Sequence, residues 1–405
     1  MDLEEFRAEA AAWLADNRVH APRDYGPILP PDLRAEGMAW QRLLFDAGFA
    51  GIHWPVDFGG RGLTPEHTAA WVEQCVLASV PAFINMVGVV LAGGSLLLFG
   101  TDGQKAEHLR PIIRGERVWC QLFSEPGAGS DLASLTTRAE QDGDGWRLTG
   151  QKVWCSNGRI SDWGICLART SGEGSASDDR HNSLPPVRDR SSGELWRQPG
   201  GEDSERSERS EPTKHQGVSF FLVDMHAPGV EVRPLRQMTG ASDFDEVFLD
   251  AVLVPADGLL GEPGQGWAVA MATLTNERGH IGASAISLQR RLDALASLSD
   301  GGLDAVGRDE LAQLIGRGRA YLALAQRQGA VASVAASLMK LGVTELLFDT
   351  AVLRTSLAGA HAMLDGDAAQ GVLAAPGGRI AGGTTQVQKN IIGERILGLP
   401  KEPRP

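Results

Sequence analysis

The sequence predicts an α+β fold in which two helical regions flank a central β-sheet region. Apolar residues recur at helical spacing between residues 1 and 117, as in Phe6, Ala10 and Trp13. Short runs of β-forming residues, separated by Gly, Asp and Asn, fill residues 118–255. From about Trp267 the helical period returns in long Ala/Leu/Ile segments that continue to Ala375, which predicts a C-terminal bundle of the four-helix type over residues 256–400.

The expected elements follow in chain order. Pro and Gly separate the helical segments of the first region. The middle region holds the strand-like runs VWCQLF, WRLTG, KVWCS, WGICLA, VSFFLV and FDEVFL. Within it, residues 171–216 are dense in Ser, Gly, Pro and charge, and such a composition cannot bury enough apolar surface to offset chain entropy. We expect a disordered insertion there rather than a docking loop anchored by Leu184 and Trp196.

The composition excludes several classes of function. The chain has 405 residues, a net charge of -13 and no long basic run, so we expect no nucleic-acid partner. Its N-terminal segment lacks the order of a signal peptide, and no uncharged apolar run is long enough to span a bilayer, so we expect a cytoplasmic protein without membrane insertion. The histidines lack metal-ligand spacing, and no metal site is expected.

The densest motif is FSEPGAGSD at residues 123–131, directly after a strand-like run. Gly127 and Gly129 allow the backbone to approach a ligand closely, and Ser124 and Ser130 add hydroxyls that could bind polar edges or phosphate. The alternative is a tight turn between strands, which the motif taken alone favours.

A second segment, KVWCSNG at residues 152–158, ends a strand with an aromatic ring, a hydroxyl and an amide. A lone Trp in a strand is usually a core residue. The alternative is a ligand-binding strand end.

Together the two segments resemble the acyl-CoA dehydrogenase family, whose sheet domain holds the flavin ring of FAD between a TEPGAGSD-like loop and a KxWITNG-like strand. The resemblance extends over nearly the whole chain. WPVDFGG at 54–60 is similar to the family's WPxEYGG, FDEVFLDAVLVP at 244–255 to the exit from its sheet, and IAGGTTQVQKNIIGERILGLP at 380–400 to its C-terminal segment. The resemblance implies an N-terminal helical domain at 1–117, a central β domain at 118–255 and a C-terminal helical domain at 256–400.

The resemblance also implies a cofactor and the residues that hold it. Ser124, Trp154 and Ser156 would contact the isoalloxazine ring of FAD, and Ser130 would lie along the CoA thioester arm. The full set of cofactor residues that it implies is Phe123, Ser124, Gly129, Trp154, Ser156, Thr384 and Gln386.

The catalytic base departs from the family's commonest pattern. That pattern is YEGT, whose Glu removes the α-proton of the substrate, and Gly382 stands in its place here. Some members carry the base on a helix in an LxxER context, which LTNER matches, so we expect Glu277 to be the base and Arg278 to lie near the CoA arm. A solvated Glu277, or one paired with Arg278, is the alternative. The backbone N–H of Gly382 would still stabilise the thioester oxygen.

The resemblance bears on partners as well. Electrons would leave to an electron-transfer flavoprotein. The family's RxxFG segment, which reaches the FAD of a neighbouring subunit, has no counterpart after Gln289. Members that degrade steroid or sterol CoA thioesters share this lack and the IAGGT and LTxER motifs, and several form α2β2 assemblies. We therefore expect a homotetramer or a heterotetramer with a second family member.

The resemblance thus implies an FAD-dependent acyl-CoA dehydrogenase that acts on a branched or steroid-derived acyl group. Two alternatives stay open. One is a non-catalytic structural subunit that completes a partner's flavin site, suggested by the missing Glu and RxxFG. The other is an oxidase or flavin monooxygenase on the same fold.

Overall fold

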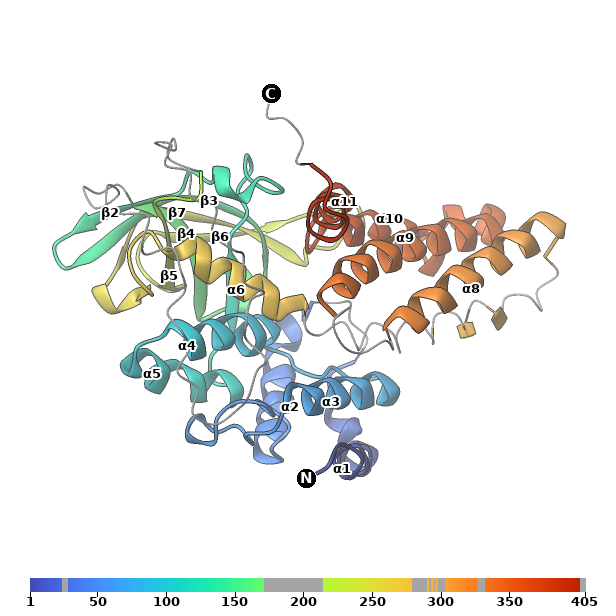
Figure 1. The fold of residues 1–405 in the computed structure, drawn as a ribbon, viewed down its shortest axis with the longest axis horizontal. Helices are drawn as coiled ribbons and strands as arrows, with labels where there is room; N and C mark the ends of the chain where they lie inside the picture. Colours follow the sequence, from blue (N-terminus) through green and yellow to red (C-terminus); the bar gives the residue numbers. More distant parts are fainter. Residues whose placement is uncertain are drawn as a thin grey trace.

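The computed structural model describes residues 1–23, 28–170, 214–278, 303–325 and 332–400, together with residues 290, 293, 294, 296 and 297. The side chains at 275–278, 325 and 332–336 lie outside this description. So does almost all of the insertion predicted at 171–216, of which only 214–216 are described. The predicted α+β fold is confirmed, with a sheet between two groups of helices (Figure 1).

The N-terminal region is helical because its apolar residues recur on one face of each helix. It comprises α1 (Leu3–Asn17), α2 (Arg34–Asp46), α3 (Pro65–Ala78), a π-helical segment at Val87–Ala92, α4 (Gly93–Phe99) and α5 (Asp102–Ile113). Side-chain caps at Asp2 and Thr101 begin α1 and α5. The helices enclose an aromatic core in which Phe49 stacks on Trp71, with ring centroids 4.4 Å apart.

The sheet holds eight strands in the order β6-β7-β3-β2-β4-β5-β8, with β1 paired in parallel to β4. Six consecutive residues of β5, from Val218 to Val223, are buried, which is the pattern of a strand covered on both faces. Helix α6 packs against β5. The strands are β1 (Trp119–Leu122), β2 (Arg138–Asp142), β3 (Gly145–Ser156), β4 (Trp163–Thr170), β5 (Val218–Asp224), β6 (Val230–Leu235), β7 (Phe244–Val254) and β8 (Leu259–Leu260).

The C-terminal region consists of α6 (Gly266–Arg278), α8 (Ala305–Ala325), α9 (Ala332–Ala358), α10 (Asp367–Ile380) and α11 (Thr385–Ile391). Helix α9 contacts α8, α10 and α11 and so forms the centre of this group. These helices extend away from the sheet, whereas α6 lies across it (Figure 1). Helix α6 also contacts α4 and the π-helical segment, which ties the C-terminal region to the N-terminal one.

Candidate active site

The 123–131 loop leaves the end of β1 as a tight turn. Glu125 and Ala128 exchange two backbone hydrogen bonds, of 3.1 and 3.0 Å, so the turn considered as the alternative is present. A Cβ added at Gly127 or Gly129 would meet no heavy atom within 4 Å, and neither glycine has a positive φ. Neither packing nor backbone conformation within the chain requires these glycines. The open space beside them therefore suits a ligand that approaches the backbone.

A buried ion pair joins this loop to β3. Lys152 Nζ donates to Glu125 Oε1 at 2.8 Å and to the backbone carbonyls of Phe123 and Leu167 at 3.2 and 2.8 Å. Lys152 is 0% exposed and Glu125 is 5% exposed. Each of the three ammonium protons has an acceptor, as a buried charge requires. The pair therefore fixes the loop on the strand, and the Val153 N–H, which donates to the Ser124 carbonyl at 2.9 Å, adds a second link.

The Glu125 carboxylate is held on its other side by two threonines. The backbone N–H and hydroxyl groups of Thr136 and Thr137 donate to its oxygens. Burial by itself raises the pKa of Glu125, but the Lys152 charge and the hydrogen bonds from Lys152, Thr137 and Thr136 outweigh it and lower that pKa to about 2. The carboxylate is thus ionised at neutral pH and serves as a fixed anchor.

Trp154 lies where β3 bulges. The pairing of β3 with β7 shifts register between Lys152 and Cys155, and Trp154 has φ 60°. This backbone region costs a non-glycine residue about 1–2 kcal/mol, and such strain is concentrated at functional sites. The bulge turns the indole outward, where it is 58% exposed and meets the edge of Phe244 with ring centroids 5.8 Å apart. Trp154 is therefore not the core residue that a lone strand Trp usually is.

The two segments that meet at this strand end carry polar groups without a hydrogen-bond partner among the described residues. Among the described residues, the half-buried hydroxyls of Ser124 and Ser156 form no hydrogen bond. Asn157 has φ 63°, and its Oδ1 atom is buried without a partner. An exposed indole, two hydroxyls and an amide oxygen that lacks a donor are groups suited to a flat aromatic ligand with polar edges, such as a flavin ring.

The structure gives less support for a binding role of the other residues predicted in the sheet region. The Phe123 ring is buried against Phe220, so this residue can act at the site only through its backbone. Gly129 and Ser130 are exposed on the loop. Asp131, which ends the motif, accepts hydrogen bonds from Lys214 and Ser134, and that from Lys214 is the largest cause of its lowered pKa.

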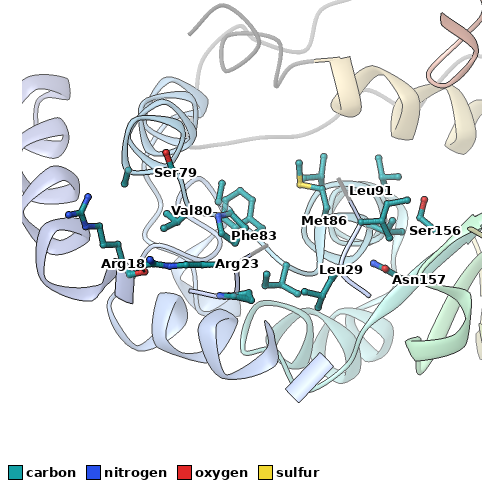
Figure 2. Close-up of a pocket in the computed structure, with 18 of the residues that line it drawn as sticks. Arg18, Arg23, Leu29, Ser79, Val80, Phe83, Met86, Leu91, Ser156 and Asn157 are labelled. Atoms are coloured by element: carbon teal, nitrogen blue, oxygen red, sulfur yellow. Dashed lines mark hydrogen bonds between the residues drawn. The ribbon is translucent and has the colours of Figure 1, made fainter. Parts of the chain in front are cut away.

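A cavity of about 1120 Å³ opens beside Ser156 and Asn157. Its walls come from residues 18–23 and 28–29, from the 77–91 segment that includes the π-helical turn, and from Gln121 on β1. Figure 2 shows Ser156 and Asn157 at one end, with Leu29, Phe83, Met86 and other mainly apolar side chains along its length. The cavity therefore connects the Trp154 strand end to the N-terminal helices.

The Gly382–Gly383 turn lies between α10 and α11. Both glycines have positive φ, 64° and 95°. The Gly382 carbonyl accepts from Gln388 Nε2 at 3.2 Å, and the Gly383 carbonyl accepts from Lys340 Nζ at 2.5 Å. The Gly382 N–H donates to no group among the described residues, and the residue is exposed. A free, exposed N–H on a turn with tethered carbonyls is available to an external acceptor.

The two residues that follow this turn have different surroundings. Thr384 caps α11, its hydroxyl oxygen accepting from the Val387 N–H at 3.2 Å, which leaves its O–H available as a donor. Gln386 is exposed. The hydrogen bonds of this turn run to α9 and α11, and among the described residues none joins it to the 123–131 loop.

Glu277 and Arg278 are the last two residues of α6, and their side chains lie outside the described residues. Helical spacing places position 277 on the same face as Thr273 and Ala270. Both of those are buried, and the Thr273 hydroxyl is 2.6 Å from that of Ser95 on α4. Position 277 therefore continues the face of α6 that packs on the N-terminal helices.

Family models match most of the chain. The N-terminal domain of acyl-CoA dehydrogenases matches residues 2–116, the middle domain residues 120–199 and the C-terminal domain residues 310–397. Acyl-CoA dehydrogenase IpdE1 of Mycobacterium tuberculosis is 35% identical over 429 aligned residues, which cover 99% of each chain. This chain belongs to the acyl-CoA dehydrogenase family.

Solved structures of acyl-CoA dehydrogenases share its fold. The Tcur3481-Tcur3483 steroid ACAD has a TM-score of 0.75 at 24% identity, covering 99% of this chain and 100% of that one. The ChsE4-ChsE5 complex of Mycobacterium tuberculosis has a TM-score of 0.73 at 23% identity and 98% coverage of each chain. A glutaryl-CoA dehydrogenase of Mycobacterium smegmatis, in complex with FADH2, has a TM-score of 0.69 at 18% identity, covering 100% of this chain and 96% of that one.

The sequence analysis did not predict several residues that shape the site. The Lys152–Glu125 pair could have been suspected, since a Lys and a Glu inside strand-like or glycine-rich motifs require partners if buried. Lys340 and Gln388 carried no such signal. Among the residues that the structure describes, no group of His, Cys, Asp and Glu could hold a metal ion, and no helix is long and apolar enough to cross a membrane.

Proposed function

We propose that this protein is an FAD-dependent dehydrogenase that forms the trans-2,3 double bond of an acyl-CoA thioester. The observation that carries the proposal is the outward-turned indole of Trp154 on its strained bulge, beside two free hydroxyls and a large, mainly apolar cavity. Packing among the described residues does not explain this arrangement. A flavin and an acyl group together would use every part of it.

The cofactor would be held by two groups of residues. From the sheet region these are the 123–131 loop, through Ser124, Gly129 and the Phe123 backbone, and the strand end with Trp154 and Ser156. From the C-terminal region they are Thr384 and Gln386. Bound FAD supplies the acceptor for the hydride that leaves the β-carbon of the substrate. An electron-transfer flavoprotein is the proposed acceptor of the electrons, which must leave the flavin before another substrate can react.

Glu277 is the proposed base. It removes the α-proton of the acyl group, which is acidified by the adjacent thioester carbonyl. Its backbone position supports this role, since it lies one helical turn beyond buried Thr273, on a face that packs against the π-helical segment, and three residues of that segment line the cavity. A carboxylate near such a wall would lose hydration and become a stronger base.

The thioester oxygen gains negative charge as the α-proton leaves. The Gly382 N–H is the proposed donor to it, and the free N–H on a turn whose carbonyls are tethered supports this role. Ser130 and Arg278 would bind the CoA arm.

The size of the cavity favours a bulky acyl group. Its volume of about 1120 Å³ exceeds the range of about 300–1,000 Å³ that is usual for sites of drug-sized ligands. A branched or steroid-derived acyl group would fill such a space better than a short straight chain. The likeness to a structure named as a steroid ACAD points in the same direction.

The assembly would be a tetramer, either of one chain or of two family members. Exposed apolar residues on the C-terminal helices and beyond, including Met363, Ile380 and Leu397, would be covered in it. The likeness to the ChsE4-ChsE5 complex supports the two-chain form.

Replacement of the proposed base tests the function. Glu277→Gln is expected to slow reduction of bound flavin by an acyl-CoA by about 10²–10⁴-fold, measured by anaerobic stopped-flow absorbance. Glu310→Gln, the same change at an exposed position on α8, is the matched control and should react like the parent. A flavin-loaded Glu277→Gln protein that reacts as fast as the control would exclude Glu277 as the base. Steady oxygen consumption with acyl-CoA would instead favour the oxidase reading.

A further inference from the structure

The cavity has two chemically different ends. Ser156 and Asn157 form one end, beside the strand that carries Trp154, and Arg18 and Arg23 form the other (Figure 2). If the reacting carbons lie at the Ser156 end, as the proposed function requires, the arginine end receives the part of the acyl group that is remote from the thioester.

Most residues along the space between the two ends are apolar. Three large hydrophobic side chains that line it are unusually exposed, namely Val19 at 64%, Leu77 at 49% and Met86 at 43%. Exposed apolar side chains gathered around one cavity mark a binding surface, because a ligand that covers them removes their area from water.

The described residues at the arginine end of the cavity carry only positive charge. Arg18 and Arg23 are the only ionisable side chains among the described residues that line the cavity, although the chain as a whole carries a net charge of -13. Neither forms an ion pair with a described residue, and both are exposed. Among the residues that the structure describes, no carboxylate lines the cavity to offset these two positive charges, so this end of the cavity favours an anion.

A hydrogen bond from a side chain to the backbone joins the two arginines. Arg18 begins a 3₁₀ turn, Arg18–His20, directly after α1. A guanidinium nitrogen of Arg23 donates to the Arg18 carbonyl at 3.2 Å, which draws the loop back onto that turn. Neither guanidinium forms a further hydrogen bond to a described residue, so donors of both remain for a ligand at this end of the cavity.

We propose that the acyl group bound here carries a carboxylate at the end remote from its thioester, and that Arg18 and Arg23 bind that carboxylate. A guanidinium presents paired N–H donors that match the two oxygens of a carboxylate, and the charge strengthens the bonds. A ketone or hydroxyl in the same place accepts hydrogen bonds without the charge and binds more weakly. The substrate is then an acyl-CoA that is anionic at both ends and apolar between them.

The phosphates of CoA could also supply an anion for these arginines, and ligand pairs separate the two sources. The ligands are dodecanoyl-CoA, the mono-CoA ester of dodecanedioic acid and free CoA, whose CoA portions are identical. The variants are Arg18→Met, Arg23→Met and the double change, and Arg319→Met, an exposed arginine on α8, is the matched control. Dissociation constants are measured by titration calorimetry on the flavin-loaded protein.

We expect the parent and the control to bind the dicarboxylic ester about tenfold more tightly than dodecanoyl-CoA, and the double variant to lose this preference while its affinity for dodecanoyl-CoA is unchanged. Equal weakening for all three ligands would assign the arginines to the CoA phosphates and overturn the proposal. A parent without the preference would overturn it too. Because binding is read apart from turnover, a retained preference without flavin reduction would refute only the proposed dehydrogenation.

Discussion

The two halves of the candidate site are built in different ways. On the sheet side, the 123–131 loop and the β3 bulge are joined by a buried ion pair, Lys152–Glu125, in which every ammonium proton has an acceptor. On the C-terminal side, the Gly382–Gly383 turn is exposed, and side chains from α9 and α11 hold only its carbonyls. One half is fixed by a buried polar network, and the other presents bare backbone.

Under the proposed function, the sheet half would bind the cofactor and the turn would take part in the reaction. A buried, fully bonded network has one low-energy arrangement, so the sheet half is ordered before any ligand arrives. The turn offers a backbone N–H that does not depend on the side chain at position 382. The family's usual Glu can therefore be absent there without loss of this donor, provided that another residue supplies the base. Changes on the sheet side should act on stability and cofactor affinity, and changes at the turn on the reaction rate.

The largest expected effect on stability follows from breaking the ion pair. Lys152→Met leaves the Glu125 carboxylate buried without its cation, which is expected to cost about 3–5 kcal/mol in the free energy of unfolding. Urea unfolding monitored by far-UV circular dichroism measures it. Lys214→Met removes an exposed partner of Asp131 in the same loop and should change stability by less than about 1 kcal/mol. Equal costs for the two variants would show that the buried pair does not anchor the sheet half.

A smaller effect is expected at the bulge. Trp154→Gly and Trp154→Ala both remove the indole, so both should weaken FAD binding, measured by quenching of flavin fluorescence. Glycine also relieves the left-handed backbone at φ 60°, so the Gly variant should be more stable than the Ala variant by about 1–2 kcal/mol. Unchanged FAD affinity in both variants would remove Trp154 from the cofactor site.

A change at the Gly382–Gly383 turn should affect the rate of flavin reduction more than the affinity for FAD, in contrast to changes at the bulge. Gly382→Ala places a Cβ on a backbone at φ 64° and is expected to cost about 1 kcal/mol while slowing flavin reduction more than it weakens FAD binding. Gly371→Ala is the matched control, since this exposed glycine lies within α10 with nothing within 4 Å of an added Cβ. It should be neutral or stabilise by about 0.5–1 kcal/mol. A Gly382→Ala protein with parental reduction kinetics would contradict the role of its N–H.

The most gradual effect is the acid dependence of stability. The pKa of Glu125 is lowered from 4.5 to about 2 in the folded chain, so its ionised form stabilises the fold fully above pH 4.5. That contribution is lost as the pH falls from 4.5 through 2, because the folded carboxylate is then protonated. The stability difference between the parent and Glu125→Gln should shrink over this window. A difference that stays constant with pH would contradict the lowered pKa.

Local patterns were enough to predict the fold and the two sheet-side motifs. Helical and strand periods depend on near neighbours, and FSEPGAGSD and KVWCSNG are each continuous in sequence. The Lys152–Glu125 bond joins residues 27 positions apart, and the Lys340–Gly383 bond joins residues 43 positions apart. No local sequence pattern predicts either bond. The cavity likewise combines Arg18, Met86 and Ser156, which only the folded chain brings together. The left-handed backbone of Trp154 depends on how β3 pairs with β7, so it too was beyond prediction from sequence.

The most direct test of the proposed function is the visible absorption spectrum of the purified chain, expressed alone, before and after anaerobic addition of acyl-CoAs. The panel should include straight, branched, steroid-derived and dicarboxylic esters. We predict a flavin band that is bleached by at least one bulky ester. A chain that holds FAD but is bleached by none of them would contradict the proposed dehydrogenation. A colourless chain would show that it does not hold FAD by itself.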